Sequence, residues 1–412
     1  MSKWQWLWRQ FSKKLWVRTS LFCILAVLTS LAAIVLKDYI PQDISRKVGA
    51  DSVDKILQII ATSMLAVTTF SLSTMVAAYS AATTNVTPRS TQLLLNDNTA
   101  QNALSVFLGS FLYSIVGIIA LAMGVYGDSG RLILFAVTII VIFIIVAVLI
   151  RWINYLTFLG RVGQTTDMIE REAQKALSTH ISTPGLGAHV ITDYTPEPDH
   201  FAINCKRIGY VQHIDMGRLS ELAKDKKALI YLTMLPGAFN DSSKALAFSS
   251  KPFGQEAINS AINAFSIGDD RSFDQDPRFG LIVLSEIASR ALSPAINDPG
   301  TAIDIIGTSI RLLAPWVMRP NESPDVIYPD LYVPALKTSD LFDDIYAPIA
   351  RDGAGLVEVG SRLQKALTAL HEIGNAEAKR QSRRHSQQAL KHANLALGLQ
   401  EDKDLMAHLA LS

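Results

Sequence analysis

The chain has 412 residues, of which 49% are hydrophobic, and its formal net charge is +1. Its 75 charged residues are unevenly distributed, since residues 1–160 contain 18 of them and residues 161–412 contain the other 57. Four stretches have no Asp, Glu, Lys or Arg, at 19–36, 56–88, 98–127 and 132–150. Because crossing a bilayer takes about 20 apolar residues, these stretches predict a membrane region and exclude a wholly soluble protein.

The net charge differs between the two parts of the chain. Residues 1–160 carry a net charge of +6 and the remainder carries −5. A mildly acidic soluble part is atypical of nucleic-acid binders, so we expect no nucleic-acid partner. The two cysteines, Cys23 and Cys205, lie far apart in the sequence. The chain therefore has no disulfide framework, which is typical of proteins facing a reducing cytoplasm.

The first 36 residues predict an interfacial segment followed by a membrane span. Residues 1–18 combine five basic residues and four tryptophans with no acid, which is typical of a segment lying on a membrane surface. The span expected at 19–36 ends at Lys37. A cleaved signal peptide is the alternative, but the basic segment is long and no small-x-small cleavage site precedes Lys37.

Three further spans are expected at about 56–82, 103–126 and 132–150, within a transmembrane domain of residues 19–153. A tight turn at Gly127–Gly130 joins the last two spans. The uncompensated positive charges before Thr19 place the N-terminus in the cytoplasm. Four spans then return the chain there, so both termini are predicted to be cytoplasmic.

The rest of the chain predicts an α+β region. A helix continues from Arg151 to about Thr179, within a helical connector of residues 154–187. Short strand-like runs then predict a small β module at 188–250, with a brief helix starting at Asp215. Residues 251–412 predict a helical domain, in which a Pro-rich connector at 320–334 contains a possible short strand at 331–333. The expected fold is an α-helical membrane protein, with four transmembrane helices followed by a cytoplasmic α+β region made of a small β module plus helices.

The second span carries small and hydroxyl residues at spacings of three and four, which places them on one helix face. They are Thr62, Ala66, Thr69, Ser73, Ala77, Ser80 and Thr84. One interpretation is a packing face, because small residues let transmembrane helices approach closely. The other is a path lined by water or ions. The four spans contain no Asp, Glu, Lys, Arg or His, which argues against an ion-coupled carrier and leaves a passive pore, a sensor or an anchor.

The densest polar stretch of the second part lies at 267–304. Its acids could attract a divalent cation, but their spacing does not follow a calcium loop, so solvated or arginine-paired acids are favoured and no metal is expected. Asn297-Asp298-Pro299 is typical of a turn and helix start, with Asp298 as the cap. The alternative is a polar pocket. Its candidate residues are Arg271, Asp274, Asp276, Arg290, Asn297, Asp298 and Thr301.

Common catalytic signatures are absent from the sequence, including the phosphate-binding loop, Gly-x-Ser-x-Gly and His-Glu-x-x-His. We therefore do not expect an enzyme, and no cofactor is implied. The basic cluster at 379–391 is typical of a solvated helix face, with contact to anionic lipid as the alternative.

Three segments resemble a known family. They are 80–121, 208–239 with GYVQHID and PGAF, and 271–302 with DQDPRFGL and RALSPAINDP. They resemble the bacterial predicted-membrane-protein family called domain of unknown function 2254. The resemblance implies a bacterial inner-membrane protein and brings no established activity. Two positions depart from the family, since Ala238 stands where it tends to have an acid and Glu286 where it tends to have Asp.

Two functions follow from the residues. The first is an oligomeric passive channel-like protein, in which span 2 lines a path and the cytoplasmic region gates it. The alternative is a membrane-anchored ligand-sensing or scaffold protein that uses the polar pocket. The expected partners are the lipid bilayer, further copies of the chain, and a small ion or small-molecule ligand.

Overall fold

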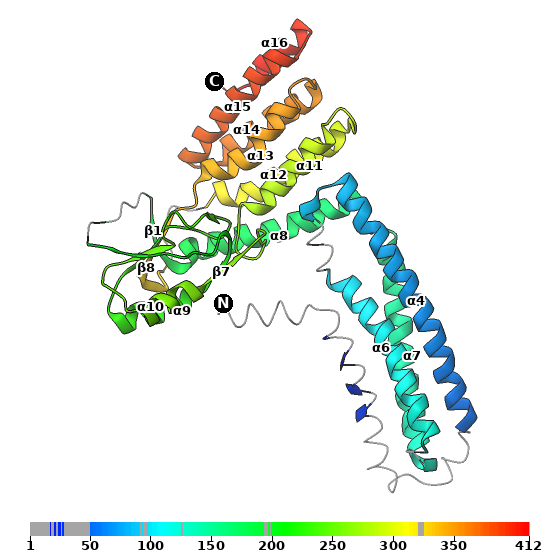
Figure 1. The fold of residues 1–412 in the computed structure, drawn as a ribbon. Coiled ribbons are helices and arrows are strands. Elements are labelled where there is room, and N and C mark those ends of the chain that lie inside the picture. Colours follow the sequence, from blue (N-terminus) through cyan, green and yellow to red (C-terminus); the bar gives the residue numbers. More distant parts are fainter. Residues whose placement is uncertain are drawn as a thin grey trace. The chain divides into compact units, whose positions relative to one another are not determined.

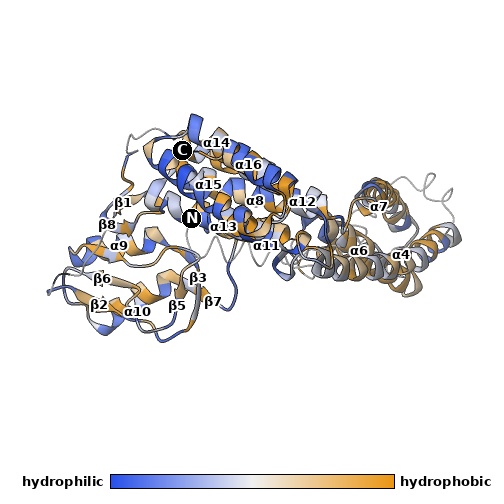
Figure 2. Cartoon of the chain, turned by 90° about the horizontal axis from the view of Figure 1, so that it is seen from above, coloured by the Kyte–Doolittle hydropathy of each residue, from blue (hydrophilic) through white to orange (hydrophobic). Residues whose placement is uncertain are grey.

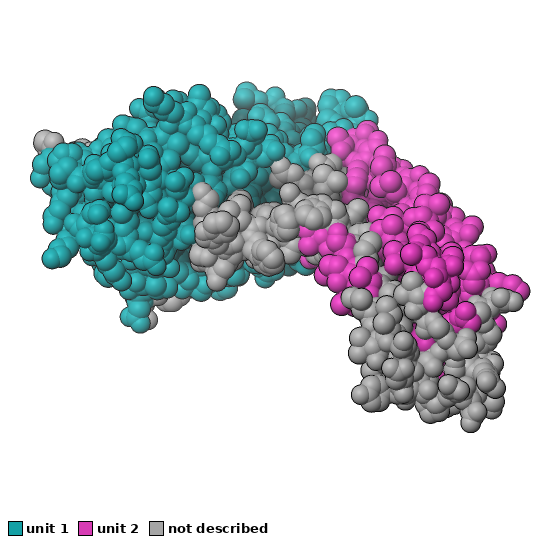
Figure 3. Space-filling view, turned by 60° about the horizontal axis from the view of Figure 1, so that its bottom comes forward, with its two compact units in different colours: residues 1–6, 85–90, 165–412 teal, residues 7–84, 91–164 magenta. Residues whose placement is uncertain are grey.

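The protein is described from a computed structural model, which divides into two compact units (Figures 1 and 3). Unit 1 contains residues 1–6, 85–90 and 165–412, and unit 2 contains residues 7–84 and 91–164. The structure describes 50–90, 93, 97–124, 127–192, 197, 199–319 and 325–411, with seven isolated positions between 17 and 28.

Unit 2 is built from three long helices, α4 (Ala50–Asn85), α6 (Asn98–Ala122) and α7 (Gly127–Leu156). All three are long and apolar enough to cross a membrane, and Figure 2 shows their hydrophobic colouring. They confirm three of the four expected membrane helices. The first expected span at 19–36 and the interfacial segment at 1–18 lie outside the described residues, apart from the isolated positions.

Two local predictions for this part of the chain were wrong. Gly127–Gly130 is not a tight turn but the first turn of α7. The helix expected from Arg151 to Thr179 is interrupted, since α7 ends at Leu156 and α8 (Val162–Ser182) begins six residues later. Between them Gly160 has a φ of 82°, a left-handed conformation, and a Cβ there would lie 3.3 Å from that of Ala78. The close approach of two backbones, which a hydropathy pattern does not reveal, ends the helix.

Unit 1 contains two small sheets. Their strands are β1 (Ala188–Ile191), β2 (Phe201–Ile203), β3 (Gly209–Ile214), β4 (Ile230–Leu232), β5 (Phe239–Asn240), β6 (Ala247–Ser249), β7 (Phe265–Gly268) and β8 (Tyr328–Pro334). One sheet has the order β1-β8-β4-β6-β2, and the other has the order β5-β3-β7. β8 runs parallel to both its neighbours, while the other pairs are antiparallel. β7 comes from a part expected to be helical, whereas β8 contains the short strand expected at 331–333, so the β structure extends beyond 188–250.

Two helices supply apolar side chains to the sheet core. They are α9 (Met216–Lys226) and α10 (Gln255–Ala264), and their buried residues pack with the inward-facing residues of β4, β6 and β8. Asp215 caps α9 by accepting a hydrogen bond from the backbone N–H of Arg218, at 3.1 Å. This confirms the helix start expected there.

The remaining helices of unit 1 pack on one another (Figure 1). They are α11 (Phe279–Ala291), α12 (Pro299–Val317), α13 (Thr338–Asp352), α14 (Val357–Ile373), α15 (Ala376–Ala396) and α16 (Gln400–Leu409). Short 3-10 turns lie at Pro88–Ser90 and Pro184–Gly187. Gly280 brings α11 against α8, because a Cβ at Gly280 would lie 2.3 Å from that of Ala173. This approach positions the C-terminal end of α8 beside the loop that precedes α11.

Candidate functional site

The small-residue stripe lies on the exposed face of α4. All seven of its residues are exposed among the described residues of the chain. The opposite face of α4 is buried through Leu57, Met64, Ser71 and Met75, which recur at helical spacing. Among the described residues the stripe therefore does not pack against α6 or α7.

Three hydroxyl groups of the stripe are hydrogen-bonded within their own helix. Thr62, Thr69 and Ser73 each donate to the carbonyl four residues earlier, at 2.9, 3.0 and 3.0 Å. Their oxygens keep acceptor capacity on the exposed face. Bulky exposed residues flank the stripe on both sides, including Phe70 and Leu72. The stripe is thus an exposed row of small residues with bulky apolar residues beside it.

The seven residues of the expected polar pocket divide into two groups. Arg271, Asp274 and Asp276 precede α11, and the other four lie at its C-terminal end and at the start of α12. The helix rise separates the two ends of α11 by about 18 Å. The seven residues therefore do not line one pocket.

The group at the start of α12 forms a turn and a helix cap. Asp298 accepts hydrogen bonds from the backbone N–H of Thr301, at 3.1 Å, and from its hydroxyl, at 2.6 Å. These bonds hold the pKa of Asp298 below its usual range. Asn297 takes a left-handed φ of 49°, and Pro299 occupies the first helical position. The structure agrees with the turn interpretation of these residues.

The group before α11 contains a buried ion pair. Nε and Nη2 of Arg271 both contact Oδ2 of Asp276 at 2.7 Å, and the side chain of Asp276 is 1% exposed. Oδ1 of Asp276 accepts from the backbone N–H groups of Arg278 and Phe279. Burial raises the pKa of Asp276, and Arg271 opposes that shift. The carboxylate therefore joins Arg271 to the first turn of α11.

A turn from the sheet region lies directly over this ion pair. A Cβ at Gly237 would lie 2.2 Å from Oδ2 of Asp276 and 2.8 Å from Nη2 of Arg271, and the φ of Gly237 is 92°. The backbone of Gly237 donates to the carbonyl of Val211 at 2.8 Å. Only glycine allows the turn to approach the pair this closely.

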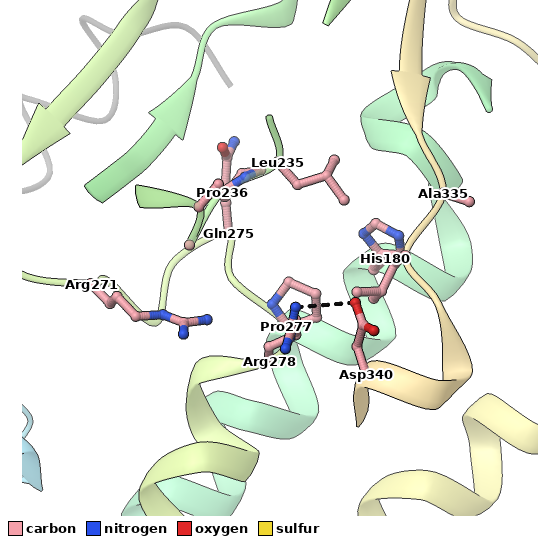
Figure 4. A pocket seen from close by; sticks show the side chains of 12 residues that line it. His180, Leu235, Pro236, Arg271, Gln275, Pro277, Arg278, Ala335 and Asp340 are labelled. Atoms are coloured by element: carbon pink, nitrogen blue, oxygen red, sulfur yellow. Dashed lines mark hydrogen bonds and ion pairs between the residues drawn. The ribbon is translucent and has the colours of Figure 1, made fainter. Parts of the chain in front are cut away.

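Arg271 of this ion pair lines a cavity of about 160 Å³ (Figure 4). Its polar lining comprises His180 of α8, Arg271, Gln275, Arg278 and Asp340 of α13. Its apolar lining is Leu235, Pro236, Ala238, Pro277, Ala335 and Leu336. Sequence reasoning identified Arg271 among these. It did not identify His180 and Asp340, because neither residue belongs to a recognisable sequence motif.

The charged groups on the α13 side of the cavity are firmly held. Arg278 contacts both oxygens of Asp344, at 2.7 and 2.9 Å, and one oxygen of Asp340 at 3.1 Å. His180 lies against the ring of Trp316. Burial, helped by nearby Arg319, lowers the pKa of His180 to about 4, so its imidazole is neutral at pH 7.

Metal ligands are sparse in the part of the chain that the structure describes. Glu197, Asp199 and His200 could together hold an ion, since their ligand atoms lie within 4.8 Å of one another. The two carboxylates are exposed, and such groups are common without an ion. The acids at 269–276 do not form such a group among the described residues, because Asp276 is paired with Arg271.

Glu286, near the middle of α11, contacts the segment that follows α4. The hydroxyl of Thr87 donates to Oε2 of Glu286 at 3.0 Å, and Arg89 forms an ion pair with Oε1. Val86 and Ser90 are buried in the same segment. Residues 85–90 are thus an integral part of unit 1 although they follow directly on α4.

Comparison with known proteins identifies the family. Residues 12–369 match the family described as predicted membrane protein DUF2254. The chain belongs to the DUF2254 family of predicted membrane proteins. It is 28% identical over 222 residues to an uncharacterised protein of Mycobacterium bovis and to one of Mycobacterium tuberculosis. The match covers 52% of this chain and 42% of those relatives, so it spans about two fifths of their length. No solved structure matches the chain.

Ala238 and Glu286 both lie at places that the structure describes in detail. Ala238 lines the cavity beside Gly237. Glu286 carries both contacts to the segment after α4. Membership of the family brings no established reaction to either place.

Proposed function

We propose that this chain is a subunit of a homo-oligomeric, passive channel-like protein in which the exposed stripes of several α4 helices face a shared axis. One observation carries the proposal: all seven stripe residues face away from the surface that α4 packs on α6 and α7. An exposed row of small residues in a membrane helix is suited to close approach by another helix or to lining a path.

The chemistry of the stripe supports a passive path. Its hydroxyls donate within the helix, so their oxygens can accept hydrogen bonds from water or contact a passing ion. Exposed Phe70 and Leu72 would contact neighbouring subunits on either side. Copies sharing one membrane orientation assemble with cyclic symmetry by default. In this proposal the protein lies in the bacterial inner membrane, with both termini and unit 1 in the cytoplasm.

Cysteine cross-linking and flux together test this function. In a variant with Cys23 and Cys205 replaced by alanine, Ser73→Cys should form cross-linked oligomers in membranes. Ser71→Cys is the matched control, because Ser71 lies two residues away on the buried face and should not cross-link. Purified protein in liposomes should pass ions or small solutes. A monomer with no flux under any stimulus would overturn the proposal.

A second candidate function is ligand sensing by a membrane-anchored protein. The cavity beside Arg271 favours it, since two arginines, a neutral histidine and a carboxylate converge on a space large enough for a small molecule. A thermal-shift screen of the full chain in detergent, against metabolites and ions, tests it. Unchanged melting with every compound would reject this candidate and leave the channel proposal unaffected.

A further inference from the structure

Arg271 has hydrogen-bond donors that no described residue uses. Its Nε and Nη2 share one oxygen of Asp276, and its side chain is only 18% exposed. Among the residues that the structure describes, none accepts a hydrogen bond from Nη1. Figure 4 shows the guanidinium pointing toward the cavity. A largely buried guanidinium with an unused edge favours a ligand oxygen, above all a carboxylate.

The α13 side of the cavity favours a positively charged ligand group. Arg278 contacts the carboxylates of both Asp340 and Asp344, so one cation faces two anions there. Within this cluster of three side chains, the carboxylates outnumber the guanidinium by one. Asp340 is the carboxylate that lines the cavity, and neutral His180 lies on the same side (Figure 4). This side favours a ligand cation with several donors, such as an ammonium group.

The size and the apolar lining of the cavity limit which ligand can contact both Arg271 and Asp340. A volume of about 160 Å³ is well below the 300–1,000 Å³ of pockets for drug-sized ligands. The surfaces between the charged groups are apolar, and Ala238 and Ala335 contribute only methyl groups. A small molecule that carries both charges and a short apolar group fits these conditions.

We propose that the cavity binds a small zwitterion, an α-amino acid with a short side chain, whose carboxylate pairs with Arg271 and whose ammonium pairs with Asp340. The proposal rests on the second candidate function and names the ligand class of that site. A simple anion would satisfy Arg271 but approach Asp340 with like charge. A simple cation would pair with Asp340 but leave the free edge of Arg271 unpaired. Arg271 and Asp340 together therefore disfavour the binding of a simple anion and of a simple cation.

Isothermal titration of the full chain in detergent with three matched compounds tests the proposal. Alanine is the probe, propionate lacks its ammonium group, and ethylamine lacks its carboxylate. Alanine should bind at least about tenfold more tightly than either fragment, since each charge-assisted contact contributes to affinity. Equal affinity for alanine and propionate, or no binding of alanine at millimolar concentration, would overturn the proposal.

Two variants test whether Asp340 contacts the ammonium group of the ligand. Asp340→Asn should weaken alanine binding about tenfold or more while leaving propionate binding unchanged or stronger. Asp343→Asn is the control, because it makes the same change on the same helix outside this cavity and should leave both affinities unchanged. Equal losses in the two variants would contradict the assignment. If another compound from the thermal-shift screen binds and alanine does not, the ligand class is wrong but the sensing function stands.

Discussion

Arg89 and Glu286 form an ion pair across 197 positions of the chain, and Glu286 also accepts a hydrogen bond from Thr87. Arg89 follows the C-terminal end of α4, whereas Glu286 belongs to α11, whose first turn is capped by the carboxylate of Asp276. The segment after the stripe-bearing helix is therefore anchored on the helix that leads to the cavity. A change at the cavity that moved α11 would act directly on this anchor.

The anchor can be measured by a double-mutant cycle. Arg89 is 57% exposed and Glu286 is 28% exposed, so their coupling energy should be only about 0.2–1 kcal/mol. Glu286→Ala also removes the bond to Thr87 and should cost about 1–2 kcal/mol in total. Denaturant unfolding of Arg89→Ala, Glu286→Ala and the double variant gives these values. A coupling of zero, with unchanged hydrogen exchange at 86–90, would show that the pair anchors nothing.

Gly237→Ala should strongly destabilise unit 1. Its new Cβ would meet Asp276 and Arg271 at distances far below van der Waals contact, and alanine is strained at a φ of 92°. We expect a loss of about 2 kcal/mol or more in the free energy of unfolding. Gly355→Ala is the control, since a Cβ there has open space and its φ is not left-handed. Equal thermal midpoints for the two variants would contradict the close approach of the turn to the ion pair.

The stability of unit 1 should fall as the pH is lowered from about 6.5 to 4. Burial lowers the pKa of His180 to about 4, so in this window the unfolded chain binds a proton that the folded chain does not. The stabilising contribution is complete above the unfolded value of about 6.5 and declines below it. The full difference corresponds to about 3 kcal/mol.

A histidine replacement isolates this contribution. His180→Gln should reduce the slope of the unfolding free energy against pH between about 6.5 and 4. His408→Gln changes an exposed histidine and should leave the dependence as in the original protein. Parallel curves for all three proteins would show that His180 is accessible to protons in the folded state.

Asp298→Ala tests whether the Asn-Asp-Pro sequence is a cap or a binding element. Loss of its two hydrogen bonds to Thr301 should cost about 1 kcal/mol of stability. Binding at the cavity should be unchanged, because Asp298 lies at the far end of α11 from Arg271. Weaker alanine binding with unchanged stability would restore the pocket interpretation of this turn.

The sequence by itself determined the features that depend on neighbouring residues. Charge-free stretches located α4, α6 and α7, and the caps Asp215 and Asp298 were found from the residues that follow them. These signals are local, because a span depends on its own hydropathy and a cap on the next backbone N–H groups. The small-residue face of α4 was likewise visible from helical spacing alone.

Tertiary structure decided what those features contact. β8 begins at Tyr328, far along the chain from both β1 and β4, and yet it pairs between them in one sheet. The cavity is lined by residues from four separate segments, including His180, Gly237, Arg271 and Asp340. None of these residues belongs to a sequence motif that predicts its contacts. A single sequence encodes helix and strand periods over a few residues, whereas pairing between distant segments depends on how complete elements pack. For that reason the expected pocket residues were divided between two ends of α11, and the residues that do converge were found only in the folded chain.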